Sequence, residues 1–391
     1  MSRRRALFLV PEAPYPAHSG GSMRSACLFE YLAERYEMDV IAFRESGSPD
    51  PATQFPTRFF ADILVLDLPR HRKDPVSRAA RNAGRVARGI PPLVDRFRGF
   101  GNAITGFVAG RHYAVAVVEH LWCGPYLEVI APVSEKTVLD LHNIESVLHE
   151  RCAADETGPA AFAHHLFAQW ARELEACWLP RYNLVLTASI EDEKIAGAIA
   201  PGARIAVFPN AIPLVLRPSI AERDVVAFSG NLEYHPNVGA VRYFHREIWP
   251  ALREKWPALV WRLIGKNESA VRNEIGVDDR IEFSGPVVDA IEELAGAKVV
   301  VVPLLAGSGT RFKLLEAWAA GRAVVSTAMG AEGLPARHGE NVLIADGAVA
   351  FGDSVSRLLT DAGLRARLGE TGRALFESEF TWDSAWRQID L

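Results

Sequence analysis

The sequence predicts an α/β protein of two doubly wound domains, each with a parallel sheet covered by helices on both faces. Short apolar runs alternate with longer helical patterns along the whole chain, and a proline-rich stretch without periodicity divides it into two halves. The chain has 391 residues. That length accommodates two domains of about 150–200 residues each.

The strand predictions rest on short runs that are apolar over their whole length, which is typical of strands buried on both faces of a parallel sheet. In the first half the predicted strands are Ala6–Val10, Asp39–Phe43, Ile63–Leu66, Ala114–Val118, Thr137–Leu141, Leu184–Thr187 and Ile205–Phe208. In the second half they are Val225–Ser229, Val260–Ile264, Ile281–Ser284, Val299–Pro303, Ala323–Ser326 and Val342–Ile344.

The composition is that of a soluble globular protein, with 49% hydrophobic and 23% charged residues. No apolar run approaches the roughly 20 residues that cross a bilayer. The apolar run Ala6–Val10 is too short for a secretory signal and meets Pro11 at once, so we expect a first strand there. The four cysteines show no paired spacing for a metal site or a disulfide framework. The segment from Pro209 to Arg223 has three prolines and reads as an interdomain linker.

Residues 70–98 carry nine Lys or Arg residues against two Asp, although the chain has a net charge of −5. Small and apolar residues between Val76 and Val86 form a weak stripe within this segment. A basic amphipathic helix of this kind binds an anionic membrane surface or an acidic polymer. The alternative is a solvated helix that covers one domain.

A glycine-rich turn, Gly307-Ser308-Gly309, follows a predicted strand and opens a helix with Thr310 as the expected N-cap. The N-terminus of a helix presents free N–H groups and partial positive charge, so this turn is suited to an anion such as a diphosphate. Arg311 and Lys313 in the first turn then require an anionic partner. Glu316 lies on an otherwise apolar helical stripe, where a carboxylate needs a partner. Ligand hydroxyls are one candidate, and a helical ion pair with Lys313 is the other.

In the first half, polar and glycine residues follow the predicted strands. Gly20 and Gly21 allow close approach of the backbone to a ligand or simply form a tight turn before a helix. His142 follows the strand that begins at Thr137, and Glu119-His120 ends the strand before it. Either histidine could serve a ligand or hydrogen-bond within the fold.

Taken together, several motifs resemble GT-B-fold glycosyltransferases of family four, the retaining group one enzymes. They are Pro14 to Arg24, Ser229 to Asn237, Ile264-Gly265, Ser284 to Asp289, Gly307 to Gly321 and Gly330 to Leu334. The sequence is most similar to members associated with bacterial exopolysaccharide and cell-envelope glycan assembly. The resemblance covers essentially the whole chain and is denser in the second half.

The resemblance implies a GT-B architecture, in which two doubly wound Rossmann-like parallel-sheet domains face a cleft. Residues 1–212 would form the N-terminal acceptor-side domain, residues 213–375 the C-terminal nucleotide-sugar-binding domain, and residues 376–391 a C-terminal helix that crosses back to the N-terminal domain.

The resemblance also assigns site residues. His142 and Glu316 are the catalytic candidates. The donor-binding candidates are Gly20, Gly21, Gly230, Asn231, Gly285, Val287, Ser308, Gly309, Thr310, Arg311, Lys313 and Glu316. The acceptor-side candidates are His120, Asn143 and Glu145.

Two departures from the family pattern affect donor recognition. Ser308 stands eight residues before Glu316, where the family has a glutamate that often contacts the donor sugar. The loop that opens the second domain offers Asn231, Glu233 and His235 in place of the basic pair of many members. Transfer of that basic role to Arg311 and Lys313 is our hypothesis.

The function that the resemblance implies is transfer of a sugar from a UDP- or GDP-sugar to a glycan, lipid-linked or small-molecule acceptor, with retention of configuration. No metal or other obligatory cofactor is expected, because no Asp-x-Asp motif lies in a strand-end loop. No nucleic acid partner is expected. The expected location is cytoplasmic, or peripheral on the inner face of the cytoplasmic membrane through residues 70–98. The alternatives are a non-catalytic nucleotide-sugar-binding relative and a sugar-nucleotide epimerase. An oxidoreductase is disfavoured because no strand precedes a full Gly-x-Gly-x-x-Gly pattern.

Overall fold

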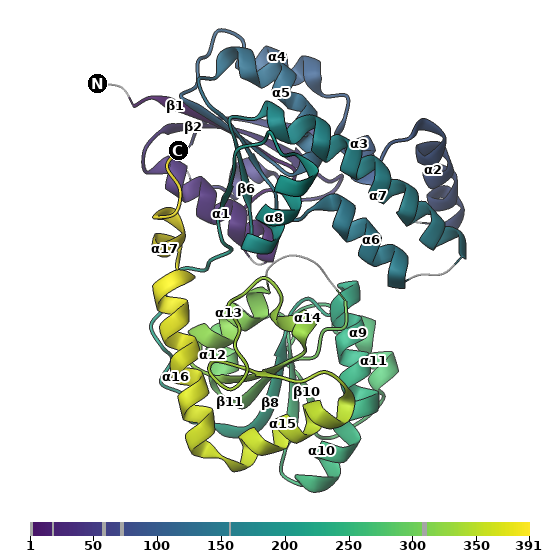
Figure 1. The fold of residues 1–391 in the computed structure, drawn as a ribbon, viewed down its shortest axis with the longest axis vertical. Coiled ribbons are helices and arrows are strands. Elements are labelled where there is room, and N and C mark those ends of the chain that lie inside the picture. The colour runs from purple at the N-terminus through teal and green to yellow at the C-terminus, as the bar shows by residue number, and fades with distance from the viewer. Residues whose placement is uncertain (1–2, 18, 57–59, 71–73, 156–157, 307–310) are drawn as a thin grey trace. The chain divides into compact units, whose positions relative to one another are not determined.

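The computed structural model describes residues 3–391 apart from 18, 57–59, 71–73, 156–157 and 307–310. The chain forms two compact units. The N-terminal unit contains Met1–Asn210 and Trp386–Leu391, and the C-terminal unit contains Ala211–Ala385. Each unit is a parallel α/β domain, as the sequence predicts (Figure 1).

The sheet of the N-terminal unit has seven strands in the order β3-β2-β1-β4-β5-β6-β7. Every neighbouring pair is parallel. The strands are β1 (Arg5–Val10), β2 (Glu37–Arg44), β3 (Phe60–Asp67), β4 (Val115–Glu119), β5 (Thr137–Asp140), β6 (Leu184–Thr187) and β7 (Ile205–Val207). The order reverses between β1 and β4, and ligands of such sheets bind at the carboxyl ends of the strands beside this point.

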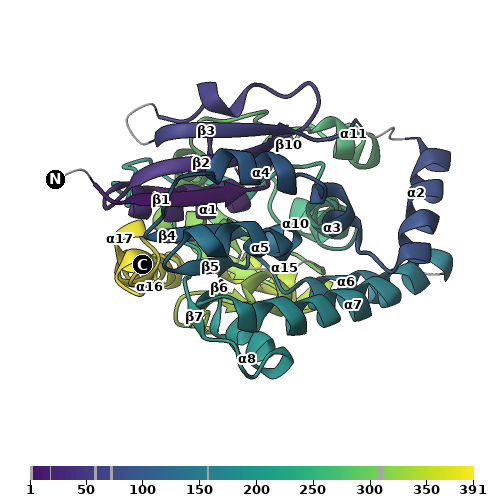
Figure 2. The same ribbon diagram turned by 90° about the horizontal axis from the view of Figure 1, so that it is seen from above.

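Helices cover this sheet, and its central strands are fully buried, as in β1 from Ala6 to Val10. The helices are α1 (Gly20–Ala33), α2 (Pro75–Arg88), α3 (Pro92–Phe97), α4 (Gly101–Val108), α5 (Leu127–Ile130), α6 (Glu145–Asp155), α7 (Gly158–Trp178) and α8 (Ile190–Ile199). Helices α6 and α7 pack against each other, and α2 lies beside the far end of α7 at the edge of the unit (Figure 2).

The C-terminal unit has a six-stranded sheet in the order β10-β9-β8-β11-β12-β13, again entirely parallel. The strands are β8 (Arg223–Ser229), β9 (Val260–Ile264), β10 (Ile281–Phe283), β11 (Ala297–Val302), β12 (Ala323–Ser326) and β13 (Leu343–Ile344). The helices are α9 (His235–Tyr243), α10 (Trp249–Lys255), α11 (Ser269–Ile275), α12 (Ala290–Ala295), α13 (Phe312–Ala319), α14 (Ala328–Ala331), α15 (Ala348–Thr360), α16 (Ala362–Glu379) and α17 (Trp382–Trp386).

The predicted strands are confirmed in both halves, with ends that differ by at most three residues. The last residues of the chain are held in the N-terminal unit. The Trp386 indole N–H donates to the Cys27 carbonyl at 3.0 Å, and the Tyr31 hydroxyl donates to the Ile389 carbonyl at 3.2 Å. No helix in the described part of the chain combines the length and apolarity that a bilayer crossing requires.

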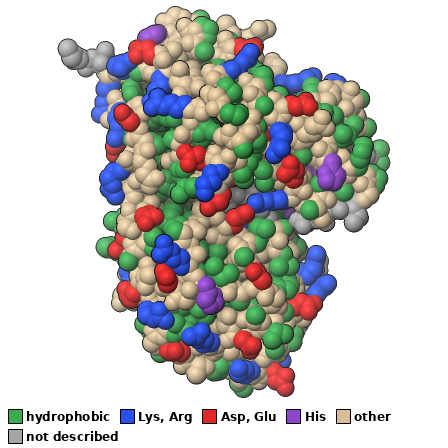
Figure 3. Space-filling view, viewed as in Figure 1, with side chains coloured by type: hydrophobic (Ala, Val, Ile, Leu, Met, Phe, Trp, Pro, Cys, Tyr) green, Lys and Arg blue, Asp and Glu red, His purple; other side chains and the backbone are tan. Residues whose placement is uncertain are grey.

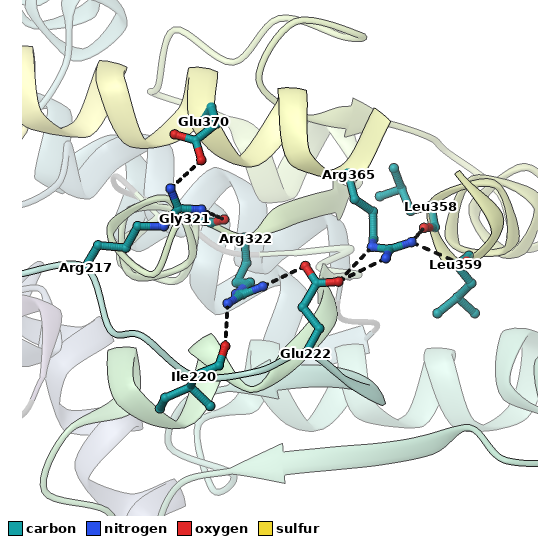
Figure 4. Close-up of polar contacts among 9 residues, drawn as sticks. All are labelled: Arg217, Ile220, Glu222, Gly321, Arg322, Leu358, Leu359, Arg365 and Glu370. Carbon is teal, nitrogen blue, oxygen red and sulfur yellow. Dashed lines mark hydrogen bonds and ion pairs between the residues drawn. The ribbon is translucent and has the colours of Figure 1, made fainter. Parts of the chain in front are cut away.

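The predicted linker lies against the C-terminal unit through a carboxylate held by two arginines (Figure 4). Glu222 accepts from Arg322 at 2.7 Å through one oxygen and from Arg365 at 2.9 Å through the other. Both arginine side chains are only 9% exposed, so each depends on this carboxylate for charge compensation. Arg322 also donates to the carbonyl of Ile220 at 3.2 Å. These contacts fix the end of the linker before β8 begins.

We expect Glu222→Ala to lower the free energy of unfolding of the C-terminal unit by about 1–3 kcal/mol, because it leaves two largely buried guanidinium groups without their carboxylate. Thermal or urea unfolding measures this change. Glu370→Ala is the matched control, since Glu370 is 61% exposed and pairs with Arg217 at the surface. That control should change stability by less than about 0.5 kcal/mol. Equal effects of the two substitutions would show that the Glu222 contacts do not anchor the linker.

Candidate functional site

In the C-terminal unit the strand order reverses between β8 and β11, which places the expected ligand position at the carboxyl ends of these two strands. Ser229 ends β8 and Gly230 follows it, and α13, which carries Lys313 and Glu316, follows β11 in the chain. The structure brings these four residues together, and we refer to them as the β8–α13 site.

The Lys313 ammonium lies directly against the backbone of Gly230. A Cβ at position 230 would stand 2.5 Å from the Lys313 Nζ and 2.8 Å from the amide nitrogen of the Asn237 side chain. Gly230 also has φ = 147°, a backbone conformation that residues other than glycine rarely adopt. A glycine is therefore required here to admit the lysine to the end of β8.

Among the described residues, the structure shows no hydrogen-bond acceptor and no ion-pair partner for the Lys313 ammonium. Its Nζ lies 5.4 Å from the centre of the Phe228 ring. Burial, together with the charge of Arg311, lowers the pKa of Lys313 to about 8, although Glu316 acts in the opposite direction. A partly buried cation without a partner is costly, so this position favours an anionic ligand.

Glu316 lies one helical turn after Lys313. Its Oε2 accepts a hydrogen bond from the Ser229 hydroxyl at 3.0 Å. Burial raises the pKa of Glu316, while Lys313 and Ser229 oppose that shift. No direct ion pair joins the two described side chains of Lys313 and Glu316, so the helical ion pair considered above is not formed. The carboxylate keeps hydrogen-bonding capacity for a ligand.

Arg311 is used within the protein. The helix α13 begins at Phe312 with Arg311 at the N-cap position, so the prediction that Thr310 caps this helix is wrong by one residue. The Arg311 side chain is 7% exposed, donates to the Met329 carbonyl at 3.0 Å and pairs with Glu332 at 3.3 Å. A role for Arg311 in ligand binding stays a prediction. The predicted residues Ser308, Gly309 and Thr310 lie outside the described residues.

The other donor candidates of this unit lie on neighbouring loops. Asn231 is adjacent to Gly230, and its side-chain oxygen accepts from the Glu233 amide at 3.1 Å and from Asn267 at 2.9 Å. Gly285 and Val287 follow β10, which is separated from β8 by β9. Asp289, on the same loop, acts electrostatically on Glu316. A role for Gly285 and Val287 in donor binding stays a prediction.

In the N-terminal unit, buried charges gather at the carboxyl ends of β4 and β5. Glu119 and Asp140 are partners in the register of these strands, and His142 follows two residues later. His142 Nε2 lies 3.3 Å from Asp140 Oδ2 and 3.7 Å from Glu119 Oε1. The Arg24 guanidinium pairs with both oxygens of Asp140, and the Ser25 hydroxyl hydrogen-bonds Glu119 at 2.6 Å. These five residues form what we call the β4–β5 cluster.

The charges in this cluster control one another. Burial alone would lower the pKa of His142, but the carboxylates of Glu119 and Asp140 raise it to about 9. Burial raises the pKa of Glu119, although His142 opposes the shift. For Asp140 burial acts upward, but Arg24 and His142 outweigh it and hold its pKa well below the usual range.

The residues predicted on the acceptor side surround this cluster. His120 has φ = 62°, stacks on Trp122 with ring centres 4.0 Å apart, and lies tilted by 42° against His142 with ring centres 3.9 Å apart. Burial and the His142 charge lower its pKa well below the ordinary value. Glu145 is 5% exposed, and burial together with Glu175 raises its pKa to about 7. Asn143 lies between His142 and Glu145 in the loop before α6.

Comparison with known proteins identifies the class. Residues 223–361 match the family model described as glycosyl transferases group 1. The chain is a glycosyltransferase with a group 1 domain. It is 27% identical over 366 residues to an uncharacterized 44.6 kDa protein in the cps region of Klebsiella pneumoniae, a match that covers 89% of each chain.

Solved structures show the same fold at low sequence identity. Sucrose-phosphate synthase from Thermosynechococcus elongatus superposes with a TM-score of 0.74 at 16% identity, covering 99% of this chain and 97% of that one. Anabaena Alr3699/HepE, solved in complex with UDP and glucose, gives 0.68 at 15% identity and covers 99% and 98%. These likenesses confirm the predicted GT-B fold of this glycosyltransferase.

The sequence interpretation gave no role to Arg24, Ser25 or Asp140, although Arg24 ends the Pro14 to Arg24 motif, Ser25 follows it and Asp140 lies two residues before His142. Arg24 is 1% exposed and is 116 residues from Asp140 in the chain. Its position four residues after Gly20, in the helix opened by the glycine pair, was the available signal. Gly21 lies close to the cluster, because a Cβ there would stand 3.7 Å from His142 Nδ1. Gly20 is the first residue of α1.

One group among the described residues has the spacing of a metal site. Ligand atoms of Glu119, Asp140 and His142 lie within 4.8 Å of one another. Both Asp140 oxygens, however, already receive the Arg24 guanidinium, and Ser25 hydrogen-bonds Glu119. Asp140 is therefore fully engaged by Arg24, while Glu119 Oε1 and His142 Nε2 have no hydrogen-bond partner among the described residues. The guanidinium on Asp140 favours an ion-paired cluster over a metal centre, because it places a positive charge where a cation would bind. The expectation that no metal is required stays a prediction.

Proposed function

We propose that this glycosyltransferase moves a sugar from a UDP- or GDP-sugar to a glycan, lipid-linked or small-molecule acceptor in exopolysaccharide or cell-envelope glycan synthesis. The observation that carries the proposal is the Lys313 ammonium against Gly230, which has no ion-pair partner among the described residues and lies one helical turn from Glu316. A diphosphate is a suitable anionic partner for Lys313, and a ribose offers hydroxyls to Glu316. The similarity to a protein in the Klebsiella pneumoniae cps region supports the assignment to exopolysaccharide or cell-envelope glycan synthesis.

In the proposed reaction an acceptor hydroxyl oxygen forms a bond to the anomeric carbon while the bond from that carbon to the diphosphate oxygen breaks. The bonding pair stays on the diphosphate, which gains negative charge and finally takes the acceptor proton. Lys313 stabilises this developing charge, because a fixed cation needs no solvent reorganisation as the bond breaks. Glu316, positioned by Ser229, orients the nucleoside. Retention by front-face displacement is carried over from the family resemblance.

Thermal unfolding with nucleoside diphosphates tests this site without any acceptor. We expect UDP or GDP to raise the unfolding temperature of the C-terminal unit, since a ligand that binds only the folded state stabilises it. Glu316→Ala should reduce the shift. Absence of any shift with UDP, GDP and dTDP at millimolar concentration would reject the proposal. A shift without sugar transfer to any acceptor would favour the non-catalytic relative, and conversion of the donor sugar without an acceptor would favour the epimerase.

We further propose that residues 70–98 bind the anionic inner face of the cytoplasmic membrane. Helix α2 contains four arginines, and it lies beside α7. Val76 on α2 and Phe162 on α7 are 79% and 65% exposed, which places apolar side chains near the basic ones. Figure 3 shows hydrophobic side chains at this edge of the N-terminal unit. Two arginines are partly neutralised, since Arg85 and Arg88 both pair with Asp95.

We expect Arg81→Glu to weaken sedimentation with phosphatidylglycerol vesicles by roughly 10-fold or more, because each charge near an anionic surface contributes about 1 kcal/mol. Binding to phosphatidylcholine vesicles should be weak for both proteins. Arg357→Glu, on the exposed face of α15 in the C-terminal unit, is the matched control and should bind normally. Equal binding to the two lipids would contradict the membrane proposal.

A further inference from the structure

We propose that Glu119 and Asp140 are positioning residues that keep His142 as an imidazolium, so that His142 offers its Nδ1–H as a cationic hydrogen-bond donor to a substrate oxygen. The inference rests on the proposed function for the identity of the substrate. It assigns His142 the role of a charged donor and excludes that of a general base.

The position of the His142 Nε2 supports this state. It lies within 3.7 Å of one oxygen from each of two carboxylates, and Glu119 and Asp140 are at most 1% exposed. Neither contact meets the geometry of a hydrogen bond, so the interaction is between charges. An unprotonated Nε2 would direct its lone pair toward these oxygens, whereas an N–H there is attracted to both. The backbone fixes the arrangement, because the two carboxylates end adjacent strands in paired register.

The charge balance of the β4–β5 cluster points the same way. Arg24 contributes one positive charge, and Asp140 and Glu119 contribute two negative charges. With a neutral His142 the cluster would hold one uncompensated negative charge in a buried site, which is costly. With an imidazolium the total is zero. The competing state has the proton on Glu119, and the measurement below separates the two.

The opposite edge of the ring faces a different environment. His142 Nδ1 lies on the side of Gly21, where a Cβ would be 3.7 Å away, and none of the hydrogen bonds found between described residues involves it. The glycine leaves this edge uncovered. An imidazolium held at Nε2 therefore presents its second N–H at the start of α1.

The charged or titratable groups around His142 come from four elements. They are Glu119 at the end of β4 with His120 after it, Asp140 at the end of β5, Arg24 on α1, and Glu145 on α6. Arg24 and His120 disfavour the imidazolium, but Arg24 is matched by Asp140, and burial keeps His120 neutral near pH 7. The negative charge of Glu119 therefore remains, and the His142 imidazolium balances it.

Nitrogen-15 NMR of the His142 ring in the unliganded protein tests the inference without any turnover. We expect both ring nitrogens to be protonated at pH 7, with a titration midpoint near the pKa of about 9. Glu119→Gln should lower that midpoint by about one to three units, since it removes one of two opposite charges. Glu135→Gln, on the exposed surface of the same unit, is the control and should leave the midpoint unchanged.

A neutral His142 at pH 7 in the unsubstituted protein would overturn the inference, and so would an unchanged midpoint in Glu119→Gln. If Glu119→Gln does not fold, the titration of the unsubstituted protein decides alone. In a Lys313→Arg background, where the titration of Lys313 is removed, the alkaline limb of the kcat/KM profile should move to lower pH together with the NMR midpoint when Glu119→Gln is added. If no nucleotide-sugar is turned over, the proposed function fails, whereas the NMR titration still confirms or overturns the charge state of His142.

Discussion

Lys313→Ala should lower kcat/KM for the nucleotide-sugar by about 100- to 1000-fold, the range observed when one charge-stabilising donor is removed from an active site. The substitution removes the only described ammonium that lies at Gly230, and with it the countercharge for a diphosphate at the end of β8. Release of nucleoside diphosphate under steady-state conditions measures the loss. Lys298→Ala is the matched control, because Lys298 lies on β11 of the same unit and pairs with Asp224 at 2.6 Å.

The pKa of Lys313 predicts how kcat/KM changes at alkaline pH. Since the pKa of Lys313 is lowered to about 8, its ammonium loses its proton as the pH rises through that value, and kcat/KM should fall above it. The profile of kcat/KM reports the free enzyme, so bound diphosphate does not mask the effect. Lys313→Arg should remove the fall that begins near pH 8, because arginine stays protonated, and leave the fall that His142 causes near its pKa of about 9. A Lys313→Ala enzyme with unchanged kcat/KM would show that the anion binds elsewhere.

Gly265→Ala should destabilise the C-terminal unit by about 3 kcal/mol or more and abolish nucleotide binding. A Cβ at this position would stand 2.0 Å from the backbone oxygen of Gly230, and φ is 140°. Since the obstructing atom is backbone, the contact is relieved only by separating β8 from the loop after β9, which displaces Gly230 from Lys313. Urea unfolding and UDP titration measure the two effects.

Gly276→Ala serves as the control for backbone conformation. Gly276 has φ = 71° and no atom within 4 Å of its missing Cβ, so only the conformational cost applies. That cost is about 1 kcal/mol. If Gly265→Ala were no more destabilising than Gly276→Ala, the close approach of Gly230 and Gly265 would not matter for the site.

The strands could be predicted from the sequence because each is a short apolar run. Buried parallel strands produce that pattern whatever their order in the sheet. The β8–α13 site could also be predicted from the sequence, since Lys313 and Glu316 lie in a single strand–turn–helix motif. Local sequence could not show that Arg311 pairs with Glu332, which lies 21 residues later.

The β4–β5 cluster was harder to predict from the sequence, because parallel strands bring together residues that are far apart in the chain. Arg24 meets Asp140 across 116 residues, and Ser25 meets Glu119 across 94. The sequence placed His142 after a strand and suggested a ligand role, but its charge depends on these distant partners. Only the register of β4 with β5 shows that two carboxylates reach the same imidazole.

The proposed function depends above all on the β8–α13 site binding and activating a nucleotide-sugar. Release of nucleoside diphosphate from a panel of UDP-, GDP- and dTDP-sugars tests it most directly, with the unsubstituted protein, Glu316→Ala, and Glu340→Ala as an exposed control 61% accessible at its side chain. We predict turnover or slow hydrolysis of one donor that is lost in Glu316→Ala and kept in Glu340→Ala. Turnover that is unaffected by Glu316→Ala, or no binding of any donor, would contradict the account.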